Sequence, residues 1–453
     1  MSVFHVGWNT LGSEHIGRLR VLDATAEGLE ADLAAARGRA RGAASVRLQA
    51  AFPDFDFVAI ARRSGTADPR TVECDPEFVS WLDPDDALYA VLLANNVGDA
   101  IAANSPAIKL ARDGDYLPLR PIVMSQKHQA LDPSLLAGIV RSDVGLVINS
   151  VDSRVPKWSR LVDDLRTVTD SDVRINAYVA DGTASGFGPH WDDHDVIVVQ
   201  TTGAKLWSFH QPSGPAPHRA VTPSEVGPLV GDLYRLKVGE GVFVPHGIGH
   251  NVICADSLAV HLTIGFLRPS PLDVLEAMAQ PAHQLPAMRV PFVFHPDGPL
   301  DSDTPSLGDP DAFGAAVGEL GGTLFESAVQ AIRLGASRPP FAGPIALLRA
   351  TADPMEQEPW VACSFGLGLG WVDGAADDRF LIAAHGGVFD LPESLGQLVT
   401  SLADGRYLAW RDFVAALPRA ERSRAPEVLD ELVAIGLIAD ARVGDAPPET
   451  RYW

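Results

Sequence analysis

The chain has 453 residues, of which 46% are hydrophobic and 21% charged, and its 58 acidic against 36 basic side chains give a formal charge of −22. This length exceeds what one hydrophobic core supports, so we expect two to four domains. The acidic balance argues against a nucleic acid or an anionic membrane as a partner, because phosphate binding needs clustered Lys and Arg. It is compatible with a basic protein partner.

The cysteines and the apolar segments bear on the cellular compartment. Cys74, Cys254 and Cys363 lie far apart and form no zinc-binding spacing, and a sparse, odd count is typical of a reducing cytoplasm. The first residues contain no basic region followed by an apolar core, and no apolar stretch reaches membrane-spanning length. We therefore expect a cytoplasmic protein that is neither secreted nor inserted into a membrane.

Residues 1–114 are expected to form an N-terminal α/β region that packs on the domain after it. Asp23 is placed to cap a helix over residues 25–37, whose leucines have helical spacing. A strand is predicted over 45–52, and a second helix after Asp83.

Residues 115–268 contain the elements of a β-rich domain. The strand predicted over 173–180 carries Asn176 and Tyr178 on one face, because they are two residues apart. The elements expected before it are helices over 131–140 and 155–165 and a buried strand over 144–151.

The stretch from Gly186 to Trp207 carries the residues that point to chemistry. Alternate side chains of a strand share a face, so His190 and Asp192 can both reach one metal ion. The third ligand is expected at His250, after a short apolar strand and a glycine-rich turn. Two histidines and one carboxylate suit Fe(II) and leave three coordination positions open for a chelating co-substrate and dioxygen.

Lys205 is expected beside these ligands. If residues 202–203 form a two-residue hairpin turn, Gln200 lies opposite Lys205 and shares the face of the two nearby ligands. A lysine buried there needs an anion, and the far carboxylate of 2-oxoglutarate would satisfy it. On the last predicted strand, His261 and Thr263 alternate toward the same interior, where they either touch co-substrate or substrate or belong to a satisfied core.

The segments PHWDDHDVIVVQTTGAKLW, GEGVFVPHGIGH and SLAVHLTIGF resemble the JmjC-type cupin family of 2-oxoglutarate oxygenases, in its ribosomal-oxygenase-like branch. The resemblance implies a double-stranded β-helix. It also implies that His190, Asp192 and His250 are the catalytic iron ligands and that Lys205 binds the co-substrate.

Two further pairs of residues follow from this resemblance. Asn176 and Tyr178 match a family Asn-x-Tyr that is associated with substrate contact. His246 stands where the family often has an arginine, and His194 shares the parity of the ligands. Either histidine replaces a named ligand, or His194 packs near the site and His246 caps its turn.

The C-terminal half is expected to be largely helical. Residues 269–376 read as a helical linker; the family uses such a segment to dimerise, so a homodimer is expected, although packing onto the chain's own barrel is equally consistent. Residues 377–453 contain three short helices and a terminal β-like wing, typical of a winged-helix-like domain. Their acidic side chains favour a structural or protein-binding module, with a DNA-binding, ligand-sensing regulator as an alternative.

The predicted fold is mainly β with α: a jelly-roll or cupin barrel over 115–268, then the helical linker and the winged-helix-like domain. The predicted function is that of an Fe(II)- and 2-oxoglutarate-dependent oxygenase. It would use O2 to hydroxylate a C–H bond of a protein or peptide, by resemblance a histidine or arginine of a ribosomal protein, and release succinate and CO2. Demethylation, a natural-product peptide or small-metabolite substrate, and a non-catalytic ligand-binding cupin are the alternatives.

Overall fold

The computed structural model describes residues 7–10, 18–20, 27–62, 68–86, 108–112, 114–117, 123–125, 130–131, 133–153, 155–182, 186–211, 228–255, 258–282, 314–315, 317–318, 321, 324–329, 331–332, 359–362, 370–372, 374–375, 377–384, 387–403, 407–434, 437, 440–443 and 451–453. The chain divides into two compact units. One unit contains Met1–Ala40 and Pro269–Ala446, and the other contains Arg41–Arg268 and Pro447–Trp453. The longer segment of the second unit runs from Arg41 to Arg268 and contains all of residues 115–268.

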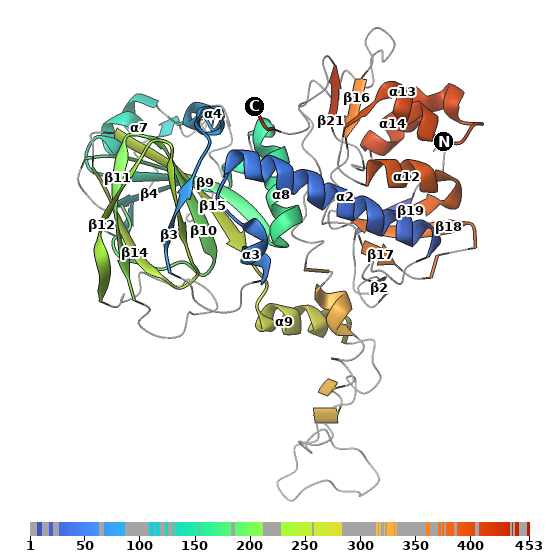
Figure 1. Cartoon of the computed structure of the whole chain (residues 1–453), viewed down its shortest axis with the longest axis horizontal. Helices are drawn as coiled ribbons and strands as arrows, with labels where there is room; N and C mark the ends of the chain where they lie inside the picture. The colour runs from blue at the N-terminus through green and yellow to red at the C-terminus, as the bar shows by residue number, and fades with distance from the viewer. Residues whose placement is uncertain are drawn as a thin grey trace, which may run out of the picture. The chain divides into compact units, whose positions relative to one another are not determined.

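The second unit is a barrel of two antiparallel sheets (Figure 1). The larger sheet has the order β3-β13-β10-β15-β9-β8-β4-β5, with bounds β3 (Arg70–Glu73), β4 (Ile108–Arg112), β5 (Asp115–Leu117), β8 (Gly145–Ile148), β9 (Asp172–Asp181), β10 (Asp195–Thr202), β13 (Glu240–Val244) and β15 (Leu258–Leu267). The smaller sheet has the order β12-β11-β14, with bounds β11 (Ala204–His210), β12 (Leu229–Lys237) and β14 (Gly249–Cys254). The expected β-rich barrel fold is confirmed.

Strand β10 shows why the sequence has a continuous apolar run at this point. Ile197 and Val199 point into the large core on the helical side of the sheet. Val196 and Val198 point the other way, into a smaller core that they share with Trp207 of the other sheet. A strand that is buried on both faces carries no polar alternation.

Helices cover one face of the larger sheet. They are α3 (Phe57–Arg62), α4 (Pro76–Trp81), α7 (Pro133–Val140), α8 (Ser159–Thr169) and the C-terminal half of α2 (Gly28–Ala51). In Figure 1, α3 and α8 lie beside β9 and β15, and the strands β12 and β14 lie on the opposite side of the sheet. The apolar side chains of the larger sheet are thereby sealed on the helical side, and its other face is left to line the barrel interior.

Helix α2 corrects the prediction for the N-terminal region. The strand predicted over 45–52 is wrong, because the helix that starts at Gly28 continues without a break to Ala51. Its buried apolar positions are three or four residues apart throughout: Leu33, Ala36, Ala40, Ala44, Leu48 and Ala51. Four of these six side chains are alanines, which pack closely but contribute little to a hydrophobic period.

The predicted hairpin at residues 202–203 is also wrong. β10 belongs to the larger sheet and β11 to the smaller one, so the two strands are not paired and the chain crosses from sheet to sheet between them. Gly203 makes the crossing with a φ of +63°, and a Cβ there would lie 2.1 Å from the carbonyl oxygen of Leu258. Lys205 still faces the interior, because it has the parity of Trp207 on β11.

The first unit contains a five-stranded sheet, β1-β19-β18-β17-β2, and a three-stranded sheet, β20-β16-β21. The strands are β1 (Gly7–Thr10), β2 (Leu19–Arg20), β16 (Pro359–Ala362), β17 (Gly370–Val372), β18 (Arg379–Ala384), β19 (Gly387–Pro392), β20 (Tyr407–Ala409) and β21 (Asp440–Val443). Its helices include α9 (Pro271–Ala282), in the predicted helical linker, and the three predicted after residue 377: α12 (Gly396–Leu402), α13 (Trp410–Ala416) and α14 (Ala425–Ala434). The winged-helix arrangement itself stays a prediction.

Several predictions fall on parts of the chain outside the described residues. They include Cys363, most of the helix expected after Asp83, and parts of the helical linker expected over 269–376, in which residues 324–329 are helical. The described part of the chain contains no helix that is both long and apolar enough to cross a membrane. Nothing in the structure bears on the predicted dimer.

Candidate functional site

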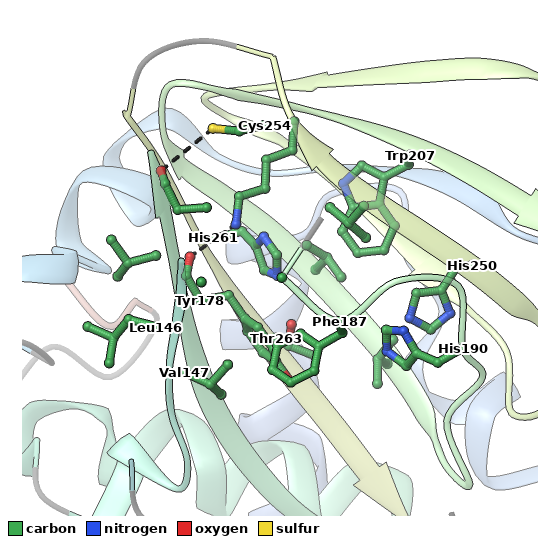
Figure 2. Close-up of a pocket in the computed structure, with 18 of the residues that line it drawn as sticks. Leu146, Val147, Tyr178, Phe187, His190, Trp207, His250, Cys254, His261 and Thr263 are labelled. Carbon is green, nitrogen blue, oxygen red and sulfur yellow. Dashed lines mark hydrogen bonds between the residues drawn. The ribbon is translucent and has the colours of Figure 1, made fainter. Parts of the chain in front are cut away.

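A pocket lies inside the barrel, between the two sheets (Figure 2). One end is formed by the segment that leads into β10 and by the start of β14; the other end is formed by the start of β11 and the middle of β15. The polar side chains that line it are Tyr178, His190, Asp192, Lys205, Trp207, His250, Cys254, His261 and Thr263. All four residues predicted as metal ligands and co-substrate anchor therefore line one cavity.

His190, Asp192 and His250 converge at one end of the pocket. One potential ligand atom from each lies within 4.8 Å of the other two. The two imidazole centroids are 4.4 Å apart, and Nε2 of His250 is 3.7 Å from Oδ2 of Asp192. Asp192 and His190 are half-buried and His250 is buried, so this end of the pocket faces solvent.

The backbone reason for this convergence differs from the predicted one. His190 and Asp192 precede β10 and do not lie in a continuous strand. Instead, His190 and His250 form an isolated antiparallel bridge, with N–H···O distances of 2.9 and 2.7 Å. The amide of Gly247 also donates to the carbonyl oxygen of Asp192 at 3.0 Å. These bonds join the segment of two ligands to the segment of the third.

Both histidines have their tautomers fixed by the backbone. Nδ1 of His190 is 2.9 Å from the carbonyl oxygen of Gly188, and Nδ1 of His250 is 3.1 Å from that of Ile248. A carbonyl oxygen only accepts, so each Nδ1 carries the proton and each Nε2 keeps a free lone pair. Burial, with a contribution from His190, lowers the pKa of His250 and keeps it neutral. Two neutral imidazoles and a carboxylate fit Fe(II) or a similar divalent metal.

The two alternative ligands lie outside this cluster. Nδ1 of His194 is 2.8 Å from Oδ1 of Asp193, and its ring packs over Gly265, where a Cβ would lie 2.8 Å from Nε2 of His194. His246 contributes its backbone amide to Oδ1 of Asp195 at 2.8 Å. Among the described residues, the group of potential metal ligands here consists of His190, Asp192 and His250.

The opposite end of the pocket is closed and contains Lys205. Its side chain is buried, and Nζ donates to the carbonyl oxygen of Tyr178 on β9 at 3.1 Å. Next to it, Sγ of Cys254 lies 3.6 Å from the carbonyl oxygen of Ala180. In the described part of the chain no carboxylate pairs with this ammonium, and burial lowers the pKa of Lys205 to about 7. Among the described residues, the closed end therefore has no anion to pair with the ammonium of Lys205.

His261 lies beside Lys205 and is held by aromatic rings. It is opposite Tyr178 in the β9–β15 register, and the two rings stack at 4.8 Å between centroids. Trp207 packs on it at 5.6 Å. Burial and the charge of Lys205 lower the pKa of His261 well below its usual value. The buried Nδ1 of His261 and Nε1 of Trp207 have no hydrogen-bond partner among the described residues. This leaves both nitrogens available to a bound molecule.

Asn176 and Tyr178 differ in their surroundings. Tyr178 lines the pocket, as expected for a residue near the reacting groups. The side-chain oxygen of Asn176 instead accepts from the amide of Ser150 at 2.8 Å, where Ser150 has a left-handed φ of +51°. Asn176 is absent from the pocket lining and holds this turn. Substrate contact by either residue stays a prediction.

A family model and the sequences of known proteins match part of this chain. Residues 152–274 match the JmjC domain family. Ribosomal oxygenase 1 of Rattus norvegicus is 32% identical over 117 residues, which cover 24% of this chain and 19% of that protein. The bifunctional lysine-specific demethylase and histidyl-hydroxylase NO66 of Brugia malayi is 27% identical over 216 residues, or 46% of this chain and 28% of that protein.

Solved structures with the same fold include YcfD of Escherichia coli. It has a TM-score of 0.51 and 16% identity, and the match covers 84% of this chain and 96% of YcfD. A second structure, described as the ribosomal oxygenase YcfD in complex with cobalt and 2-oxoglutarate, has a TM-score of 0.50. At this identity the likeness establishes a shared fold, and the sequence matches span only 19% and 28% of the two relatives above.

Proposed function

Because this chain contains a JmjC domain, we propose that it is an Fe(II)- and 2-oxoglutarate-dependent oxygenase that hydroxylates a C–H bond on a protein or peptide side chain. One observation carries the proposal: three metal-binding side chains and one buried lysine without a carboxylate partner among the described residues lie at opposite ends of the same pocket. A pocket with a metal site at its open end and a cation at its closed end suits a short dicarboxylate keto acid that spans it.

In this proposal His190, Asp192 and His250 hold the iron. Iron with 2-oxoglutarate and O2 supplies the oxidising chemistry, in which the keto acid becomes succinate and CO2 and one oxygen atom enters the substrate C–H bond. The backbone carbonyls at Nδ1 of both histidines orient the lone pairs before any metal arrives. Asp192 would supply the one negatively charged ligand of the metal.

Lys205 holds the distal carboxylate of 2-oxoglutarate at the closed end. Burial excludes water from this ion pair, so the contact is much stronger than a surface salt bridge. His261 and Thr263 lie on the same pocket face of β15 and supply further polar contacts. The aromatic rings of Tyr178 and Trp207 keep the imidazole of His261 in place.

The substrate would approach the open end, where His190 and Asp192 are half-exposed. Phe187 precedes this end, and its ring lies 6.0 Å from both His190 and the largely exposed Tyr116. A formal charge of −22 favours encounter with a basic protein, and relatives named ribosomal oxygenase and histidyl-hydroxylase support a ribosomal protein side chain such as histidine or arginine.

The proposal is tested by following succinate formation from 2-oxoglutarate with Fe(II) and O2. We expect turnover in the wild type and its loss in His190→Ala and in Lys205→Ala. Lys237→Ala, which removes an exposed lysine from β12, is the matched control and should keep turnover. Wild-type protein that binds metal but forms no succinate would instead indicate a ligand-binding cupin.

The substrate class is tested separately by mass spectrometry. Basic proteins, including ribosomal proteins, are incubated with the active enzyme and searched for a gain of one oxygen atom. Gain on a histidine or arginine side chain is the expected result. Gain on a small metabolite or a natural-product peptide, with none on any protein, would contradict the proposed substrate class.

A further inference from the structure

Asp195 is a buried carboxylate that does not line the pocket. It is the first residue of β10, and its side chain is fully buried. It has the parity of Ile197 and Val199, so it points to the helical side of the sheet, away from the cavity. A buried carboxylate is costly unless it is paired and hydrogen-bonded, so its partners have to be strong.

Those partners come from two other segments of the barrel. Oδ1 of Asp195 accepts from the backbone amide of His246 at 2.8 Å. Oδ2 accepts from Arg268, at the end of β15, at 2.9 Å, and the same guanidinium donates to the carbonyl oxygen of Ile60 at 2.9 Å. One carboxylate thus joins β10 to the turn before β14 and, through Arg268, to helix α3.

The hydrogen bond between Asp195 and the amide of His246 matters because of where His246 lies. His246 lies in the turn that leads to His250, and the next residue, Gly247, donates to the carbonyl oxygen of Asp192. Asp195 follows Asp192 by three residues. The segment that carries His190 and Asp192 and the segment that carries His250 are therefore joined on both sides of the ligands, by the His190–His250 bridge on one side and by Asp195 on the other.

We propose that Asp195 is a positioning residue that fixes the spacing of the two ligand-bearing segments and so tunes the affinity and coordination geometry of the metal site. This inference rests on the proposed metal site. Asp195 does not line the pocket and acts through its hydrogen bond with the His246 amide. Groups that orient metal ligands typically change metal affinity by roughly 10- to 100-fold when they are removed.

A purely structural role is the rival explanation, and the same unit provides a matched control. Asp164 is also a buried carboxylate paired with a buried arginine: its oxygens accept from Arg47 at 2.6 and 2.7 Å and from the hydroxyl of Tyr452 at 2.8 Å. It lies on α8, and these partners are not in the ligand-bearing segments. Loss of Asp164 therefore weakens the fold without altering the spacing of the ligands.

The experiment measures Co(II) binding to the full chain without co-substrate, by calorimetry and by the visible absorption of the bound ion. Asp195→Asn is expected to weaken Co(II) binding about 10- to 100-fold and to shift the absorption bands. Asp164→Asn is expected to lower the Tm but to keep the wild-type affinity and spectrum. Arg268→Gln removes the ion pair that holds the Asp195 carboxylate against the His246 amide. This variant serves if Asp195→Asn does not fold, and should weaken binding in the same direction.

The outcomes separate this inference from the proposed function. Wild-type affinity and spectrum in folded Asp195→Asn or Arg268→Gln would overturn the positioning role alone, as would equal weakening in Asp164→Asn. A wild type that binds Co(II) but forms no succinate with Fe(II) would overturn the oxygenase proposal and leave the positioning role standing. A wild type that does not bind Co(II) would overturn both.

Discussion

The histidines at the two ends of the barrel pocket differ in how the protein holds them in place. At the open end, His190 and His250 each have Nδ1 bonded to a backbone carbonyl, and their backbones form a bridge. At the closed end, His261 is fixed by ring stacking, and its Nδ1 has no partner among the described residues. The open end is hydrogen-bonded in advance, while the closed end contains polar groups that the described protein does not satisfy.

This difference indicates which end depends on a ligand. Preorganised imidazole lone pairs need only a metal ion to complete their site, and the protein alone keeps them in place. A buried lysine and a buried imidazole without an anion are unfavourable, and a bound carboxylate removes that cost. Metal binding and co-substrate binding are therefore expected to respond to different mutations, which gives five ways to test the comparison.

The largest effect is expected at the open end. Asp192→Ala removes the single carboxylate of the cluster, so metal affinity should fall by more than the roughly 100-fold seen when only an outer partner of a ligand is lost. Succinate formation should be abolished. Calorimetry with Mn(II) measures the affinity, and Asp193→Ala, at the adjacent carboxylate, is the control that should retain the metal. Normal Mn(II) binding by Asp192→Ala would remove this residue from the site.

At the closed end, Lys205→Met should weaken the binding of 2-oxoglutarate and leave metal binding unchanged. Removing one partner of a buried charge pair costs about 2 kcal/mol or more, which corresponds to at least about 30-fold in the dissociation constant. Binding of 2-oxoglutarate to the Mn(II)-loaded protein measures this, with Lys237→Met as the control. If Lys205→Met lost the metal as well, the two ends would not be independent.

The pH dependence of co-substrate binding tests the role of Lys205 in a second way. Burial lowers the pKa of Lys205 to about 7, but a carboxylate needs the protonated form. Affinity for 2-oxoglutarate should be steady below pH 7 and should fall by about tenfold per pH unit above it, because binding then takes up a proton. Lys205→Arg should flatten this profile, since a guanidinium stays charged. A profile of the wild type that is flat to pH 9 would contradict the role of the lysine.

The same pKa also affects folding of the ligand-free chain. Unfolded, Lys205 has its ordinary value of 10.5 and binds a proton that the folded chain has lost above pH 7. The unfolded state therefore binds more protons between pH 7 and 10.5, and this group makes the folded chain more stable as pH rises through that window. Lys205→Met should remove this contribution from the unfolding free energy measured in urea.

The smallest effect is expected from His261→Phe. Phenylalanine keeps the stacking on Tyr178 and removes the ring nitrogens. Any loss of affinity for 2-oxoglutarate therefore reports the polar contact made by the imidazole. One hydrogen bond is worth about 1 kcal/mol, so 2-oxoglutarate should bind about fivefold more weakly. Titration of the Mn(II)-loaded protein with 2-oxoglutarate, as used for Lys205→Met, detects this change. Unchanged or tighter binding would mean that the imidazole does not contact the co-substrate.

The sequence was informative about the barrel and its site because these residues obey strong local rules. The apolar run of β10, the glycine-rich turn before His250 and the spacing of His190 and Asp192 all led to the observed cavity. Yet the argument from hairpin parity reached the correct side of the barrel for Lys205 through an incorrect pairing. A turn between two sheets and a turn within one sheet have the same short sequence, and only long-range pairing distinguishes them.

Other features depended on contacts that no local pattern records. Helix α2 was divided into a helix and a strand because its buried side is mostly alanine. The convergence of His190 and His250 needed a backbone bridge between segments far apart in sequence. His261 looked like an ordinary core residue, and only its missing partner among the described residues distinguishes it; its two-residue spacing from Thr263 was the available signal.

The hydrogen bond from Lys205 to the carbonyl oxygen of Tyr178 has a consequence for any dissociation constant measured with this protein. An ammonium group has three N–H donors, so this bond occupies one of them and leaves two for an incoming keto acid. The carbonyl oxygen holds Nζ in place before the acid arrives. A change on β9 that displaces this carbonyl would move Nζ and lower the apparent affinity for the co-substrate, although the acid itself is unchanged.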